Sequence, residues 1–207
     1  METMNTWGVP ASTERINTTK SALEANGISV VVAKDGADAK AKVLEMVPKE
    51  AEIMIMTSVT LDTLGITQEI NESGNYGVVK EKLKTMDHVT QESEMRKMGA
   101  GPDWAIGSVH AVTEDGKVVV ASNTGSQIPA YAYGAQHLIW VVGSQKIVKN
   151  LDEATKRVYE YTLPLESERA KKAYGVAGSS VNKIFILNKE VQSGRTTLII
   201  VPEVVGF

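Results

Sequence analysis

The stretch ISVVVAKDGADAKAKVLEMVPKEAEIMIMT, residues 28–57, decides the fold class. Residues 28–33 and 52–57 are short and mainly apolar, which is typical of strands buried on both faces of a parallel sheet. Between them, Asp35-Gly36 predicts a turn, and residues 37–47 have the pattern of an amphipathic helix that Pro48 stops. A strand, a helix and a second strand in this order predict a doubly wound α/β fold.

The segments on either side extend this pattern. Residues 12–26 have helical spacing and end on Asn26-Gly27, a usual helix stop. The turn Glu114-Asp115-Gly116-Lys117 joins two extended runs, residues 104–112 and 118–121, and predicts a β-hairpin. Other helical patterns cover residues 61–71, 78–86, 91–98, 127–133 and 152–161. Strand patterns cover residues 138–142, 183–187 and 197–201. Residues 170–180 predict a loop. We expect an α/β fold with a mostly parallel open sheet and helices on both faces.

Length and composition limit the possible classes of protein. A chain of 207 residues is expected to form a single domain, 1–207, with residues 1–10 as a loose N-terminal tail. A net charge of -3 disfavours a nucleic-acid partner. The first 18 residues do not resemble a signal peptide, and no apolar run approaches the roughly 20 residues of a membrane span. We therefore expect a cytoplasmic protein without a membrane partner.

Cysteine and cofactor motifs are missing from the sequence. The chain has no cysteine, which excludes disulfides, iron–sulfur ligation and thiol nucleophiles. It has neither a Walker nor a Rossmann glycine loop. His88, His110 and His137 lack the spacing of metal ligands and are interpreted as surface or hydrogen-bonded residues, although His110 is also an acid–base candidate because it lies near Glu114. We expect no metal and no cofactor.

Small polar residues follow three of the predicted strands. In an open α/β sheet, ligands bind beside the carboxyl ends of the strands. Thr57, Ser58 and Thr60 precede a helical pattern, where hydroxyls and free backbone N–H groups favour an anion, although plain helix capping explains them equally well. These three residues form the first candidate binding loop.

The second candidate loop is richer in polar groups. Asn123, Thr124, Gly125, Ser126 and Gln127 follow the strand at 118–121, and the glycine would let the backbone approach a ligand closely. Four polar side chains around one glycine are more than a turn needs. This pattern favours binding over a simple turn.

The third loop, Gly143-Ser144-Gln145-Lys146, follows the strand at 138–142. Lys146 is suited to neutralise a carboxylate or phosphate as a point charge, and a solvated lysine is the alternative. Glu114 is the candidate catalytic carboxylate, either as a nucleophile or as a general base, although an acidic hairpin turn is the commoner explanation.

Several of these motifs, taken in order, resemble the LUD domain family of lactate-utilisation proteins. The matching stretches are residues 57–61 (TSVTL), 64–65, 74–76, 111–117 (AVTEDGK), 124–126, 143–148 (GSQKIV), 151–154, 194–197 and 205–207. The resemblance runs from about residue 10 to the end of the chain. It is specific because of the combined order of the motifs, and no single one carries it.

The resemblance implies the sugar-phosphate isomerase/CoA-transferase-like fold. Members of that superfamily bind phosphorylated sugars, folates or CoA esters at the strand ends, and the LUD family has a role in the oxidation of L-lactate to pyruvate. It implies a small anionic metabolite as ligand, and either a homodimer or partner subunits of a lactate-utilisation system. Class I CoA transferases use a glutamate in a Ser-Glu-Asn-Gly turn, and Thr113-Glu114-Asp115-Gly116 is similar to it.

Two departures from related chains matter. Many of them have a cysteine cluster in the stretch equivalent to residues 170–180, where this chain has none. Larger members have Glu-Thr-Gly-Thr where this chain has Glu114-Asp115-Gly116-Lys117. Three hypotheses remain open: a subunit of hydroxyacid metabolism that binds a carboxylate or phosphorylated ligand, a CoA-transferase or acyl-CoA hydrolase with Glu114 as nucleophile, and a non-catalytic metabolite-binding or regulatory module.

Overall fold

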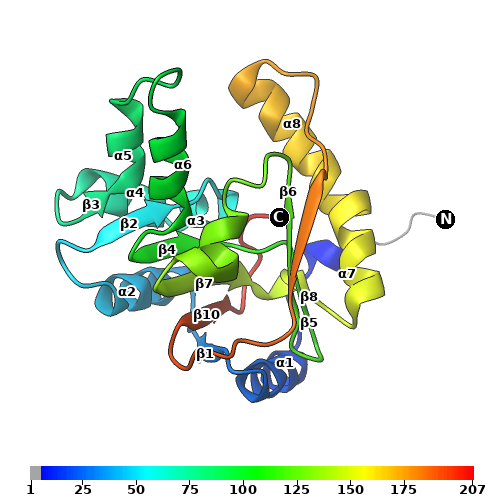
Figure 1. Cartoon of the computed structure of the whole chain (residues 1–207). Helices are drawn as coiled ribbons and strands as arrows, with labels where there is room; N and C mark the ends of the chain where they lie inside the picture. Colours follow the sequence, from blue (N-terminus) through cyan, green and yellow to red (C-terminus); the bar gives the residue numbers. More distant parts are fainter. Residues whose placement is uncertain (1–5) are drawn as a thin grey trace.

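The computed structural model describes residues 6–207, which form two β-sheets with helices packed around them (Figure 1). Of the expected N-terminal tail, residues 1–5 lie outside this described part. The next residues, Thr6–Gly8, form the short 3-10 helix η1. No helix within residues 6–207 is long and apolar enough to cross a membrane.

The larger sheet has six strands, and every neighbouring pair is parallel. Its order is β1-β10-β7-β4-β2-β3. The strands are β1 (Ser29–Val32), β10 (Thr196–Val201), β7 (His137–Gly143), β4 (Trp104–Gly107), β2 (Glu52–Ile55) and β3 (Gly77–Val78). This confirms the expected α/β fold with a mostly parallel sheet.

The helices of the first half begin where capping side chains are available. Ser12 caps α1 (Thr13–Ala25), and Asp35 caps α2 (Gly36–Met46) through the N–H of Asp38. The single helix expected over residues 61–71 is instead two helices, α3 (Val59–Thr63) and α4 (Ile66–Glu72). Gly65 separates them with a φ of 65°, a left-handed conformation that ends a helix. Two further helices follow, α5 (Val79–Lys84) and α6 (Glu92–Ala100).

The smaller sheet contains the predicted hairpin. Its order is β8-β5-β6-β9, with strands β8 (Ile147–Val148), β5 (Ala111–Thr113), β6 (Val118–Ser122) and β9 (Lys183–Leu187). The antiparallel pair β5–β6 confirms the hairpin. The extended run at 104–112 is not one strand, however, because residues 104–107 belong to the large sheet and the chain crosses to the small sheet at residues 108–110.

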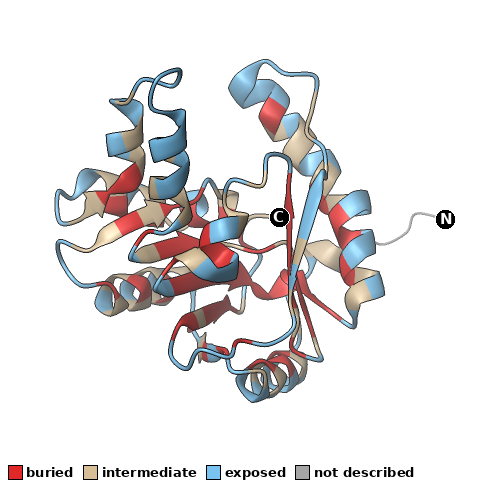
Figure 2. Cartoon of the chain, viewed as in Figure 1, coloured by how far each residue is buried: buried red, intermediate tan, exposed pale blue. Residues whose placement is uncertain are grey.

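Alternate side chains of the strands form separate core layers. On β7, Leu138 and Trp140 pack toward α1 and the small sheet, whereas Ile139 and Val141 pack toward α2, α3 and α4. A third cluster joins the small sheet to Val158 and its neighbours. Most strands are accordingly buried, apart from β9 at the edge of the small sheet, whereas α5, α6 and the far end of the C-terminal helix are largely exposed (Figure 2).

The C-terminal helices extend further than the sequence pattern indicates. Asn150, not Asp152, caps α7 (Leu151–Arg157). A π-helical turn, η4 (Val158–Thr162), leads directly into α8 (Leu163–Tyr174). The prediction of a loop over residues 170–180 is therefore wrong up to Tyr174, where Gly175 ends the helix. Another π-helical turn, η2 (Ala130–Gly134), forms near the helix expected at 127–133.

Candidate functional site

A cavity of about 570 Å³ lies at the carboxyl ends of strands β2 and β4 and beside the turn that follows β7. Helices α5 and α6 stand on one side of this end of the molecule, and α8 stands on the other (Figure 1). The volume is in the range of small-molecule sites, which is roughly 300–1,000 Å³. The cavity is also where a parallel α/β sheet usually holds its ligand.

Most of the predicted binding residues line this one cavity. Eight of them do so: Thr57, Ser58, Thr60, Asn123, Thr124, Ser126, Gln127 and Lys146. The loop of residues 122–127 reaches the cavity from β6 of the small sheet, so it does not end a strand of the large sheet. The structure therefore brings together loops from two different sheets.

Lys146 lies at the closed end of the cavity. The short 3-10 helix η3 (Ser144–Lys146) follows β7 and turns the side chain inward, leaving the residue 2% exposed. Its Nζ donates hydrogen bonds to Thr60 Oγ1 at 3.0 Å, to Ser108 Oγ at 3.1 Å and to the carbonyl oxygen of Val109 at 3.1 Å. All three acceptors are neutral, and no carboxylate within residues 6–207 forms an ion pair with the Lys146 amino group.

A second buried cation, Arg157, lies close to Lys146. It is fully buried, and its Nη1 donates to the carbonyl oxygen of His110 and to Thr162 Oγ1, while the guanidinium lies 5.1 Å from the Tyr161 ring centroid. Its Nε and Nη2 have no partner within residues 6–207. Burial, reinforced by the positive charge of Arg157, lowers the pKa of Lys146 well below its usual value.

His110 lies on the cavity wall beside these two cations. Its Nδ1 accepts a hydrogen bond from the N–H of Ala121 at 3.0 Å, which requires that nitrogen to be unprotonated. Burial, together with the positive charges of Lys146 and Arg157, lowers the pKa of His110 to about 3. His110 is therefore a neutral imidazole at physiological pH.

Charged side chains also reach the cavity from its two flanking helices. Lys80 of α5 donates to Thr57 Oγ1 at 3.1 Å, and burial lowers the pKa of Lys80 although nearby Asp62 opposes this shift. On α8, Arg169 forms a bidentate ion pair with Glu166, in which its Nε and Nη2 each lie 2.7 Å from a carboxylate oxygen. The carboxylate on that wall is thus already neutralised, whereas Lys80 forms no ion pair in the described part of the chain.

The loop of residues 122–127 is largely held by its own hydrogen bonds. Ser122 Oγ donates to Gln127 Oε1 at 3.0 Å, and Thr124 Oγ1 donates to Ser126 Oγ at 3.1 Å. Asn123 Oδ1 accepts from Asn182 of the segment before β9 at 2.9 Å. Several of the polar groups that indicated ligand binding therefore shape the loop, although they still line the cavity.

Gly125 is not among the lining residues, and its role differs from the predicted one. Its φ is 85°, and a Cβ at this position would lie 2.5 Å from Lys183 Cδ. Glycine is needed here for the left-handed turn and for the packing of Lys183. A ligand contact by this backbone has no support from the geometry.

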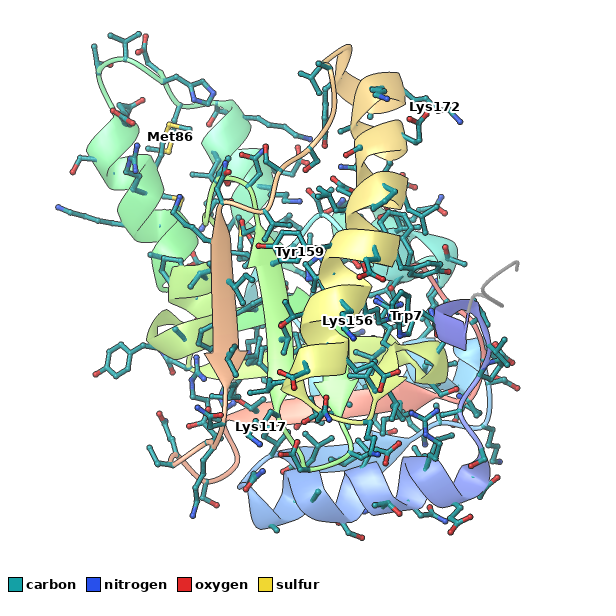
Figure 3. The ribbon with its side chains drawn as sticks, turned by 90° about the vertical axis from the view of Figure 1, so that its right-hand side faces the viewer. Trp7, Met86, Lys117, Lys156, Tyr159 and Lys172 are labelled. Carbon is teal, nitrogen blue, oxygen red and sulfur yellow. The ribbon has the colours of Figure 1, made fainter. Side chains whose placement is uncertain are left out.

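Glu114 lies away from the cavity. It sits in the β5–β6 turn, and this turn contacts the end of α1, where Asn26 Nδ2 donates to the carbonyl oxygens of Asp115 and Gly116. Glu114 Oε1 accepts from Arg15 Nε at 2.6 Å. Figure 3 shows Lys117 of the same turn beside α1, at the opposite end of the molecule from Lys172 on α8. The placement of Glu114 does not fit a nucleophile for a ligand in this cavity.

Three residues of this cavity region escaped the sequence reasoning: Ser108, Lys80 and Arg157. Ser108 directly follows β4, and it would have been found if residues 104–112 had been divided into two strands. Lys80 and Arg157 lie in ordinary amphipathic helices, and only tertiary contacts bring them to the cavity. Gly107 is also required beside Ser108, because a Cβ there would lie 1.7 Å from the Tyr131 hydroxyl.

Metal ligands do not gather anywhere within residues 6–207: no group of three or more His, Asp or Glu side chains is arranged to hold an ion. His137 instead stacks on Trp104 with ring centroids 4.3 Å apart, and His88 is exposed. The cavity offers lysine, arginine, imidazole, carboxylate, hydroxyl and amide groups.

Comparison with known proteins gives one family and one fold. A model of the LUD domain family matches residues 16–201, in agreement with the resemblance seen in the motifs. Among solved structures, the chain is similar to a DUF162 family protein from Deinococcus radiodurans, with a TM-score of 0.54 and 13% sequence identity. The match covers 93% of this chain and 99% of that one, and at this identity it shows the fold alone. No curated protein matches the chain.

Proposed function

The chain belongs to the LUD domain family, and we propose that its strand-end cavity binds a small anionic metabolite, a carboxylate or a phosphorylated compound. We further propose that this binding serves lactate or related hydroxyacid utilisation, either in the homodimer or together with partner subunits.

One observation carries the proposal: two basic side chains that line the cavity, Lys146 and Lys80, form no ion pair within residues 6–207, although the carboxylate of Asp62 lies near Lys80. Lys146 is buried against neutral oxygens, Arg157 is buried behind it, and Lys80 lies on the opposite wall. Buried charges in proteins are normally paired, because an unpaired one loses its hydration without compensation. A bound carboxylate or phosphate would supply the missing negative charge.

The shape and the polar groups of the cavity favour a small ligand. Its volume suits a compound the size of a hydroxyacid or a sugar phosphate. Hydroxyls of Thr57 and Ser58 and the amide of Asn123 line the walls, where they can accept or donate hydrogen bonds to oxygens of the ligand. The hypothesis that Glu114 is a CoA-transferase nucleophile is not proposed, because its carboxylate pairs with Arg15 and does not line the cavity.

Thermal denaturation with a panel of anions tests the proposal. The panel contains L-lactate, pyruvate, glycolate, inorganic phosphate and two sugar phosphates, and mass spectrometry of the purified protein looks for a retained ligand. A ligand at 100 times its Kd stabilises the folded state by about 2.7 kcal/mol, which raises the Tm of a chain of this size by roughly 5–10 °C.

Matched lysine variants test whether the anion binds in the cavity. Lys80→Ala is expected to reduce the ligand-induced shift in Tm, whereas Lys172→Ala, at the exposed end of α8, leaves it unchanged (Figure 3). Asn123→Ala is expected to reduce the shift as well. Equal shifts in all variants would place the ligand elsewhere, and the lack of any shift together with no retained ligand would reject the proposal.

A further inference from the structure

Ser108 is in contact with the buried lysine of the cavity. It directly follows the last residue of β4, lines the cavity and is partly exposed to it. Its Oγ lies 3.1 Å from Lys146 Nζ and 3.3 Å from Thr60 Oγ1. A serine within hydrogen-bond distance of a base is the basic requirement for nucleophilic catalysis by a hydroxyl.

Lys146 is held in position to act as that base. The carbonyl oxygen of Val109 and Thr60 Oγ1 fix its Nζ beside Ser108, and Thr60 is itself tied to the carbonyl oxygen of Val205 at 3.2 Å. This arrangement of nucleophile, base and orienting group is the one found in serine–lysine hydrolases. Burial together with the charge of Arg157 lowers the pKa of Lys146, which makes the neutral amine accessible nearer to neutral pH.

The other titratable groups around Lys146 do not compete for this role. His110 has its Nδ1 occupied by the N–H of Ala121, and Arg157 stays positively charged. Glu166 is paired with Arg169, and within residues 6–207 no carboxylate forms a hydrogen bond with Ser108. Lys146 is therefore the base available to this hydroxyl.

We propose that Ser108 and Lys146 form a catalytic dyad that hydrolyses small acyl esters or thioesters in the cavity. Ser108 is the nucleophile, Lys146 is the general base and then the general acid, and Thr60 is a positioning residue. This hydrolytic activity goes beyond the proposed function, because ligand binding alone does not require that the ligand be converted into a product.

The reaction balances with water as the second substrate. Ser108 Oγ bonds to the acyl carbon while its proton moves to Lys146 Nζ, and the bond from the acyl carbon to the leaving oxygen or sulfur breaks. The leaving group takes the proton from Lys146, which leaves an acyl-serine. Water then gives a proton to Lys146 and bonds to the acyl carbon, the bond between the acyl carbon and Ser108 Oγ breaks, Ser108 Oγ takes the proton from Lys146, and the acid is released.

The charge around the dyad favours an anionic substrate. Lys80 lines the cavity and stays available as a cation while Lys146 alternates between amine and ammonium, so a carboxylate or phosphate elsewhere on the substrate has a counterion there. This choice of substrate class rests on the proposed function. The dyad itself does not, and the experiment separates the two.

A fluorophosphonate probe tests the dyad directly, because it reacts with activated serines and does not need an anionic group. We expect one covalent adduct per chain, and peptide mapping should place it on Ser108. The labelling rate should increase with pH through an apparent pKa below the usual 10.5 of lysine. An adduct only on other serines, or none at all, would reject the dyad.

Ester hydrolysis supplies the second measurement. The probes are para-nitrophenyl acetate, which is neutral, and mono-para-nitrophenyl succinate, which carries a carboxylate. Ser108→Ala should lower kcat/KM for both by at least roughly 100-fold, whereas Ser193→Ala, in an exposed turn before β10, should leave it unchanged. Wild-type rates in a folded Ser108→Ala variant would overturn the proposal.

The two esters distinguish failure of the dyad from failure of anion binding. If the cavity binds anions, Lys80→Ala should lower kcat/KM for the succinate ester and spare the acetate ester. Equal effects on both esters, with Ser108 still labelled, would retain the dyad and reject the anionic substrate. Anion-dependent shifts in Tm without labelling of Ser108 would retain the binding function and reject the dyad.

Discussion

Two buried basic centres in this protein differ in one respect, the presence of a counterion. Arg195, before β10, forms an ion pair with Glu190 at 2.8 Å, and its other nitrogens donate to the carbonyl oxygens of Ala130, Tyr131 and Ala135. Lys146 and Arg157 are equally buried but have no carboxylate partner within residues 6–207. The first centre has its counterion within the described part of the chain, and the second has none there, which is the basis of the proposed anion site.

The difference separates a structural role from a functional one. The Arg195 centre joins the η2 turn to the segment before β10, and neither Arg195 nor Glu190 lines the cavity, although Tyr131 of that turn does. Although burial acts to raise the pKa of Glu190, hydrogen bonds from Gln192 and Arg195 hold it below the usual value. A charge with its partner stabilises the fold, whereas an unbalanced charge beside a cavity costs stability and is retained for binding or catalysis.

The strongest test of this contrast is Arg195→Leu. It leaves the buried carboxylate of Glu190 without a counterion, so the free energy of unfolding should fall by about 3–5 kcal/mol. Urea denaturation measures the loss. Arg96→Ala removes a solvent-exposed pair with Glu92 and serves as the control, with a much smaller expected loss. Similar losses in both variants would remove the distinction.

Lys146→Met should have a smaller effect on stability. It removes a charge that has no counterion and leaves the carbonyl oxygen of Val109 without its donor, so the expected loss is at most about 2 kcal/mol. Ligand-induced stabilisation and ester hydrolysis should be lost in the same variant. A loss as large as that of Arg195→Leu would mean that Lys146 is structural.

The pH dependence of stability sharpens the contrast through His110. Its pKa is about 3 in the folded state, below the unfolded value of 6.5, so the unfolded chain takes up a proton first as pH falls. The stabilising contribution is complete above pH 6.5 and is lost toward pH 3. Between pH 6.5 and 5, His110→Gln should lose about 2 kcal/mol less than wild type. The exposed His88→Gln should follow wild type.

The smallest effect is expected at the far end of the molecule. Glu114→Gln breaks a partly exposed ion pair with Arg15 and should lower stability by about 0.5 kcal/mol. Ligand-induced shifts in Tm and fluorophosphonate labelling should not change. Loss of either in a folded Glu114→Gln variant would return this glutamate to the functional site.

The central fold could be predicted from the sequence because its strands are buried on both faces. The apolar runs at residues 28–33 and 52–57 required a covered parallel sheet. The division of residues 104–112 between two sheets could not be predicted, since both parts are apolar. Helix α8 was not predicted at all, and its last residues, 171–174, are exposed and carry no helical pattern of burial.

The candidate site was predictable in position but not in chemistry. Strand-end loops meet at one edge of a parallel sheet, so residues 57–60 and Lys146 could be expected together. Glu114 seemed catalytic from its turn alone, and only the contact of that turn with α1 shows its actual surroundings. Ser108 is important because it contacts Lys146, which is 38 residues away in the sequence. Arg157 is important because it contacts His110, which is 47 residues away.

The position of β10 between β1 and β7 has a consequence for the order of folding. Ser29 pairs with Thr197, so the first strand of the large sheet has no neighbour until the last strand has left the ribosome. During synthesis, β1 and β7 cannot be joined in one sheet until β10, the strand that lies between them, has been made. Such a high contact order slows folding, and the incomplete sheet exposes unpaired strand edges that favour aggregation. We expect chaperone dependence to be greatest for nascent chains that still lack β10.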